Sequence, residues 1–222
     1  MQKIILILVL LLTSLLSLAQ LKGSGRTMTK SYEYKNFDKV NFDDLDGSLE
    51  VEIGKPFAIS VTIDDNLLPL LAFDENEKEH LLKVYFRGNT NNKLYIEDSH
   101  IKIKITMPEA SVICNNGNTN LDIKNVIGRY FRMQNLGNGD TQISGSTDSL
   151  DIEKTGNGDI HAEKLTAKKA TVKSSGNGNV VVNATQKITV SLKGNGDIKN
   201  VGAASFDQKS TKSGNGQLIM SK

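Results

Sequence analysis

The chain has one cysteine, no tryptophan, three prolines and three histidines among its 222 residues. A single cysteine excludes an internal disulfide framework, and it also excludes a cysteine-rich zinc site within one chain. This residue, Cys114, follows the apolar pair Val112 and Ile113, which predicts a buried core position. None of the histidines has a metal-ligand spacing, and His161 is expected on the surface.

An excess of charge of one sign is also lacking, because 27 Lys and Arg residues stand against 25 Asp and Glu residues, for a net charge of +2. This balance gives no support to nucleic-acid binding. The sequence contains no Gly-x-Ser-x-Gly nucleophile elbow and no phosphate-binding Gly-x-x-x-x-Gly-Lys segment. We therefore expect no enzyme, no cofactor and no nucleic-acid partner.

Long apolar runs are absent except at the N-terminus. Lys3 is followed by residues 4–12, which are all apolar, and small residues precede Gln20. A basic start, an apolar run and a small-residue exit are typical of a signal peptide, here residues 1–19. We expect export to the periplasm, the cell surface or the extracellular space, with no membrane span after cleavage. Residues 20–36 have little apolar content and are expected to form a flexible lead.

Glycine is abundant, and its distribution is uneven, because 14 of the 19 glycines lie from Gly117 onward. Most belong to a repeated Gly-Asn-Gly phrase, whose first glycines are spaced by 19, 20, 18 and 20 residues. These first glycines are Gly137, Gly156, Gly176, Gly194 and Gly214. A worn copy begins at Gly117. Self-similarity at this period is typical of a solenoid, in which each repeat forms one coil and buries its inner face against its neighbours.

The residues between the phrases alternate with period two, which predicts a strand leaving each turn and a second strand entering the next. Inward positions after the turns include Leu121, Ile123, Ile160 and Val180, and inward positions before the turns include Phe131, Met133, Leu150, Ile152, Val172 and Val190. Coils of about 20 residues that each hold two short strands and stack in parallel predict an all-β protein, a parallel β-helix.

The preceding part of the chain, residues 37–110, also alternates but without the repeated phrase, so less regular coils are expected there than in residues 111–222. Residues 66–73 predict a helical turn with Pro69 inside it and Asp64 or Asp65 as cap. Residues 88–92 are polar and predict an exposed loop.

The Gly-Asn-Gly phrase has a conformational explanation, because glycine and asparagine tolerate the backbone of tight corners. A corner repeated in every coil predicts a stacked amide ladder of Asn138, Asn157, Asn177, Asn195 and Asn215. The rival hypothesis is a Ca²⁺ site on the following column of Asp140, Asp159 and Asp197, since stacked carboxylates repel one another. Asn179 interrupts this column and Gln217 ends it. Lysines between the phrases, Lys154, Lys164, Lys173, Lys187 and Lys193, are expected outside as solvated charges.

The repeated phrases, together with residues 46–54, 64–70 and 101–108, resemble the head GIN domain family of exported proteins from Bacteroidetes-type bacteria. The resemblance covers residues 37–222. It implies a right-handed β-helix, a role in adhesion and no shared catalytic set.

The resulting prediction for function is a non-catalytic binding module for adhesion or envelope interaction, with a glycan or a surface protein as partner. A polysaccharide-active β-helix enzyme, which would need clustered carboxylates on one face, and a structural envelope spacer remain alternatives. The last coil has Gln208 and Ser210 where earlier coils have Ile and Val, so the C-terminal edge is under-covered. End-to-end self-association through that edge is the corresponding hypothesis.

Overall fold

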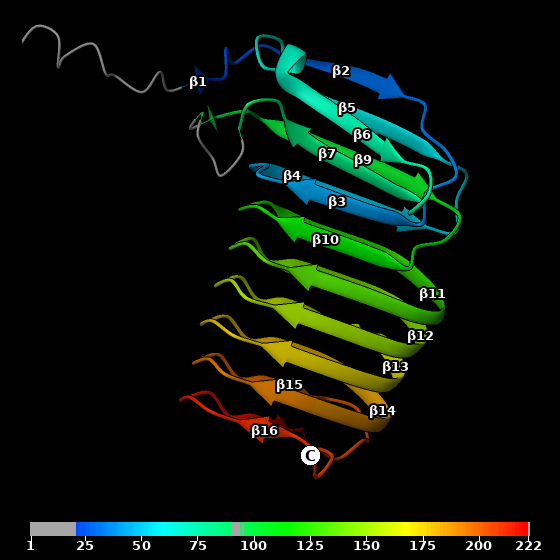
Figure 1. Ribbon diagram of the computed structural model, residues 1–222, viewed down its shortest axis with the longest axis vertical. Helices are drawn as coiled ribbons and strands as arrows, with labels where there is room; N and C mark the ends of the chain where they lie inside the picture. The colour runs from blue at the N-terminus through cyan, green and yellow to red at the C-terminus, as the bar shows by residue number, and fades with distance from the viewer. Residues whose placement is uncertain (1–20, 90–93, 95, 222) are drawn as a thin grey trace, which may run out of the picture.

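Figure 1 shows the computed structural model of the chain, which describes residues 21–89, 94 and 96–221. The predicted signal peptide, residues 1–19, lies outside the described residues. The described part consists of strands and a single 3-10 helix, η1, at Leu68–Leu70. The all-β prediction is therefore confirmed.

Strands follow one another along the whole described chain. Their bounds are β1 Leu21–Lys22, β2 Thr27–Tyr32, β3 Lys39–Asp43, β4 Gly47–Ile53, β5 Ala58–Asp64, β6 Leu71–Asn76, β7 Leu81–Phe86, β8 Ile96–Glu97, β9 Ile101–Met107, β10 Val112–Asn116, β11 Asn120–Asn135, β12 Thr141–Lys154, β13 Ile160–Ser174, β14 Val180–Leu192, β15 Ile198–Asn200, β16 Thr211–Lys212 and β17 Leu218–Met220.

Strands β1 and β8 form a separate two-stranded sheet. Hydrogen bonding arranges the other strands into two faces, and the long strands β11 to β14 contribute to both. Face A runs in the order β6, β7, β3, β10, the C-terminal halves of β11 to β14, and β16. Face B runs in the order β2, β5, β9, β4, the N-terminal halves of β11 to β14, β15 and β17. Figure 1 shows the strands stacked along the longest axis, with β2 and β6 at one end and β16 at the other.

The pairing along β10 to β17 is parallel throughout. Leu121 pairs with Thr141, Thr141 with Ile160, and Ile160 with Val180, so each residue lies over one from the preceding repeat. The sequence period is therefore the spacing of stacked strands. The first strands differ, because β2, β5 and β6 each pair antiparallel with a neighbour.

The core is the space between the two faces, and the predicted period of two is confirmed there. Ile123, Ile160, Val180 and Ile198 are fully buried on face B, and Phe131, Met133, Ile152 and Val172 are fully buried on face A. Burying such apolar side chains stabilises the fold by about 1.5–3 kcal/mol each relative to exposure. No coil has a core of its own, because each buries its inner side chains against the next.

Glycine is required at the phrase positions because the turns lie directly on one another. A Cβ on Gly156 would lie 1.5 Å from the carbonyl oxygen of Gly137, and one on Gly139 would lie 1.8 Å from that of Thr119. No side chain fits at such a distance. Backbone contact between turns thus accounts for the regular spacing of glycine along this chain.

The predicted flexible lead is wrong for residues 27–32, which form β2 and pair antiparallel with β5. The residues at the end of β5 and just after it also bind the segment that precedes β2. Asp64 Oδ2 accepts from the backbone N–H of Gly25 at 3.1 Å, and Asn66 Nδ2 donates to the carbonyl of Lys22 at 2.8 Å. These contacts were not predictable from local sequence patterns, because they join residues about forty positions apart.

Two local predictions need correction. The helical turn exists as η1 with Pro69 in its first turn, but its N-cap is Leu67 and no side chain caps it. In the predicted exposed loop, Asn89 is buried and holds its neighbours through its amide, whereas residues 90–92 lie outside the described part.

Candidate functional site

Two columns of side chains run along the edge formed by the Gly-Asn-Gly turns. In the first, each asparagine Nδ2 donates to the Oδ1 of the asparagine one coil earlier. The donor–acceptor distances are 3.0 Å for Asn138 to Asn118, 2.9 Å for Asn157 to Asn138, 2.8 Å for Asn177 to Asn157, 2.8 Å for Asn195 to Asn177 and 3.1 Å for Asn215 to Asn195. The worn phrase at Gly117 therefore contributes the first rung, Asn118, which the sequence analysis did not include.

The second column contains the three aspartates of the Ca²⁺ hypothesis, and each side-chain oxygen accepts from the backbone of the following coil. Asp140 Oδ1 accepts from Asp159 N at 2.8 Å, and Asp159 Oδ1 accepts from Asn179 N at 2.6 Å. Asn179 Oδ1 accepts from Asp197 N at 2.9 Å, and Asp197 Oδ1 accepts from Gln217 N at 2.8 Å. An amide oxygen and a carboxylate oxygen serve equally, so Asn179 continues the column.

This arrangement gives the aspartate column a structural role. One oxygen of each carboxylate is already bonded, and the described residues contain no group of three or more His, Cys, Asp or Glu side chains placed to hold a metal ion. Ca²⁺ takes six to eight oxygen ligands, so the three carboxylates of this column alone would supply only part of such a site.

We expect Asp159→Asn to leave the free energy of unfolding within about 0.5 kcal/mol of wild type, because the amide keeps the acceptor for Asn179 N. Asp159→Ala removes that acceptor and should cost about 1 kcal/mol. Urea unfolding of both variants, with and without EDTA, makes the measurement. A midpoint that falls with EDTA in wild type and not in Asp159→Asn would restore the metal interpretation.

A third, polar column lies inside the same edge. It consists of Asn115, Asn135, Lys154 and Ser174, which pair in register and are all buried. The prediction that Lys154 is exposed and solvated is therefore wrong, because its side chain is buried. Its Nζ donates to the carbonyl of Gly156 at 2.7 Å, and burial lowers its pKa. Within the described residues it makes no ion pair, while Asn135 Oδ1 and Ser174 Oγ have no hydrogen-bond partner.

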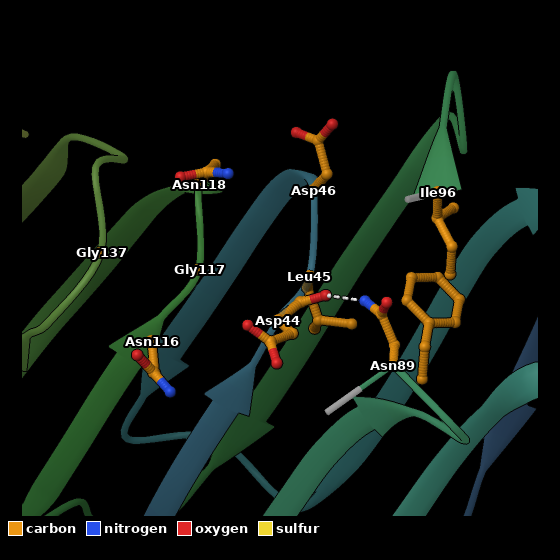
Figure 2. Close-up of a pocket in the computed structure, with 10 residues that line it drawn as sticks. Asp44, Leu45, Asp46, Asn89, Ile96, Asn116, Gly117, Asn118 and Gly137 are labelled. Carbon is orange, nitrogen blue, oxygen red and sulfur yellow. Dashed lines mark hydrogen bonds between the residues drawn. The ribbon is translucent and has the colours of Figure 1, made fainter. Parts of the chain in front are cut away.

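A hollow of about 160 Å³ lies where the irregular coils meet the first phrase, and Figure 2 shows the residues around it. Asn89 crosses it and donates from Nδ2 to the carbonyl of Asp44 at 3.2 Å. The carboxylates of Asp44 and Asp46 point in different directions in this view. The acidic residues therefore do not converge on one point, and apolar side chains such as Phe86 and Ile96 also line the hollow.

A polar groove of about 290 Å³ lies on face B, at the corner where β11, β12 and β13 leave that face. Register shifts between Ile123 and Val126 and between Gln142 and Ser144 open the corner, and Asn125 has a positive φ of 60° there. The groove is lined by Asp122, Lys124, Asn125, Gln142, Ile143, Ser144, His161, Glu163 and Lys164. It joins a smaller hollow of about 170 Å³ that shares Asp122 and Gln142. Positively charged, negatively charged and neutral polar side chains line it, and none of its lining residues is Phe, Tyr or Trp.

Salt bridges border this groove and hold two of its charged side chains, Asp122 and Lys124. Lys124 Nζ contacts Glu50 at 2.7 Å and Asp122 at 3.2 Å, and Lys104 contacts Glu50 at 2.6 Å. The two lysines hold the pKa of Glu50 below its usual range. On face A, Arg132 contacts Asp151 and Glu153 in a separate network. Both faces therefore present mixed charge.

The single thiol and the histidines His100 and His161 lie apart from one another. Cys114 is half-buried and faces outward on face A, so the predicted core position is wrong. Burial raises the pKa of its thiol to about 11, which leaves almost no thiolate nucleophile at neutral pH. His161 lies in the groove of face B. His100 Nδ1 lies 3.1 Å from the buried Asp64 at the far end of the stack, so the histidines and the thiol serve no common centre.

These features define an all-β stack with polar faces and, among the described residues, no assembled metal cluster. The family described as "putative auto-transporter adhesin, head GIN domain" matches residues 36–204, and the chain belongs to this family. The resemblance noted in the sequence is therefore confirmed. No protein of curated function matches the chain.

Several solved structures share the fold. A "putative adhesin" from Bacteroides fragilis is 19% identical, covers 90% of this chain and 99% of its own, and has a TM-score of 0.67. A "putative adhesin" from Parabacteroides merdae is 20% identical, with coverage of 92% and 100% and a TM-score of 0.53. A "putative lipid binding protein" from Parabacteroides distasonis is 21% identical, with coverage of 91% and 100% and a TM-score of 0.56. At these identities the likeness concerns the fold alone.

The description of the family favours an adhesin over an enzyme. In the part of the chain that the structure describes, no helix has the length and apolar character needed to span a membrane.

Proposed function

We propose that the chain is an exported, non-catalytic binding module that acts in adhesion at the cell surface or in the envelope. In this proposal the stacked strands form a right-handed parallel β-helix, and residues 1–19 are removed as a signal peptide. The parallel pairing at the repeat period and the family membership support it.

The groove on face B carries the proposal. It offers paired donors and acceptors on a rigid sheet, and its charged rim is fixed by salt bridges, which reduces the entropy lost when a partner binds. Because no Phe, Tyr or Trp lines it, a polar protein surface suits the groove better than a sugar ring, which commonly stacks on such a side chain. The partner we propose is a surface protein of mixed charge.

The test is binding of the purified full chain to arrays of envelope proteins, host proteins and glycans, with and without EDTA. We expect a saturable, EDTA-insensitive protein hit that Gln142→Arg weakens by at least about tenfold, because the new side chain fills the groove. Thr171→Arg on face A, an exposed residue of β13, is the matched control and should bind like wild type.

Equal binding by wild type and Gln142→Arg would remove the groove from the proposal. Binding to glycans alone would identify a glycan, rather than a surface protein, as the partner. Mass spectrometry of the exported chain tests the signal peptide in the same preparation, with Gln20 expected as the first residue.

A further inference from the structure

On face A, the two ends of the stack differ in charge. On face A the outermost strands are β6 at one end and β16 at the other, and each pairs with a neighbour on one side only. An unpaired strand edge presents backbone groups that accept another chain. The two ends of this face are therefore two separate edges available for pairing.

The β6 end is acidic. Asp74, Glu75, Glu77 and Glu79 are exposed on β6 and the turn after it, and Lys78 is the one basic residue among residues 74–79, so this segment has a net charge of 4 − 1, or −3. None of these four carboxylates makes an ion pair with a lysine or arginine of the described residues.

The β16 end is basic. Lys209 and Lys212 are exposed, and the nearby Asp207 is already neutralised by Lys187 at 3.1 Å. Lys212 pairs in register with Leu192, which is buried, so it occupies an inward position of the last coil. It is exposed because the described chain places no further strand over that position.

Apolar side chains lie only partly covered at both ends of the core. Phe206 and Leu218 pack on the core at the β16 end, and Tyr32, Tyr34 and Phe73 pack on it at the β6 end. The Phe73 ring lies 4.5 Å from that of Tyr32 and 5.3 Å from that of Tyr34, measured between ring centroids. Elsewhere in the stack such inner surfaces are buried by the next coil.

From these observations we infer that a second copy of this chain docks head to tail, with the basic β16 end of one copy on the acidic β6 end of the next. This contact covers the apolar side chains at both ends and brings Lys209 and Lys212 toward Asp74 and Glu75. Contact between two like ends instead brings lysines to lysines or carboxylates to carboxylates, which costs free energy. A head-to-tail contact does not close on itself, so it forms short linear chains of copies rather than a fixed dimer.

The experiment is sedimentation velocity on the full chain over a series of concentrations at low and high salt. We expect the weight-average mass at low salt to rise at least about twofold above 24.2 kDa with concentration and to fall back at high salt, because the contact is electrostatic at its rim. A mass that stays at the monomer value at every concentration overturns the inference.

Charge reversal identifies the ends. Lys209→Glu with Lys212→Glu makes both ends acidic, and Asp74→Lys with Glu75→Lys makes both ends basic, so neither variant should associate alone. Mixing the two variants, or combining all four substitutions in one chain, should restore association. Lys169→Glu with Lys173→Glu, both exposed on β13 in the middle of the stack, is the control and should behave as wild type.

The assignment of the two ends is contradicted if both charge-reversal variants still associate. It is also contradicted if the control variant on β13 loses association to the same extent as they do. The result is independent of the groove on face B, because Gln142→Arg leaves both ends intact and should associate as wild type does. Failure of partner binding and failure of self-association are therefore separate outcomes.

Discussion

Gly156→Ala is expected to destabilise the fold by at least about 3 kcal/mol, or to prevent folding. The added Cβ would lie 1.5 Å from the carbonyl oxygen of Gly137, which is itself part of a stacked turn. Relief requires the two coils to separate, and this breaks the asparagine bond between Asn157 and Asn138 as well. Denaturant unfolding monitored by circular dichroism provides the measurement.

Gly54→Ala is the matched control. Gly54 has a positive φ of 86° but open space around its Cα, so an alanine there meets only the backbone cost of about 1–2 kcal/mol. A variant at Gly156 that is no less stable than the one at Gly54 would show that the turns do not lie in contact.

Replacing the buried lysine is the second large effect. Lys154→Met keeps the length of the side chain and removes a buried charge that makes no ion pair within the described residues, and we expect stability at neutral pH to rise by about 1–2 kcal/mol. Leu192, two strands further along the same inner column, shows that an apolar side chain fits such a position. Lys173→Met, an exposed lysine on the same face, is the control and should change little.

The dependence of stability on pH provides a separate test of the buried charge on Lys154. The folded state lowers the pKa of Lys154, so the unfolded chain holds more protons between that lowered pKa and the ordinary lysine value near 10.5. Stability of wild type should therefore rise with pH across this window and be lowest, and constant, below it. The difference between wild type and Lys154→Met should shrink as pH rises, and a difference that is constant with pH would contradict the burial of the charge.

The regular half of the fold was predictable because its strands and turns are marked by residue patterns that recur within each repeat of the sequence. Glycines at a fixed period, alternating apolar residues such as Ile123 and Met133, and an asparagine in every corner define the stacked strands and their inner faces without an alignment. The bonding of Asn138 to Asn118 follows from the same period, since any residue at a fixed place in the repeat lies over its counterpart.

Other features depend on contacts that a repeat does not encode. Lys154 has the composition of a surface residue, and only its register with Asn135 places it inside. Asp140 repeats like a metal ligand, but its oxygen bonds the backbone of the next coil. The groove is formed by register shifts at the far corner, and β2 reaches β5 across about thirty residues of chain, so neither was visible as a periodic signal.

The register shifts have a consequence for how this architecture varies. Repeats of 18, 19 and 20 residues share one rigid Gly-Asn-Gly edge. The length differences are absorbed after the face B strands, between Ile123 and Val126, between Gln142 and Ser144, and between Ala162 and Thr166. Insertions at this corner need not disturb the ladder on the opposite edge. The molecule therefore has one edge of constant geometry, at the Gly-Asn-Gly turns, and an opposite corner that tolerates changes in length. The groove lies at this corner, so binding specificity can diverge between related chains while the stacked strands stay the same.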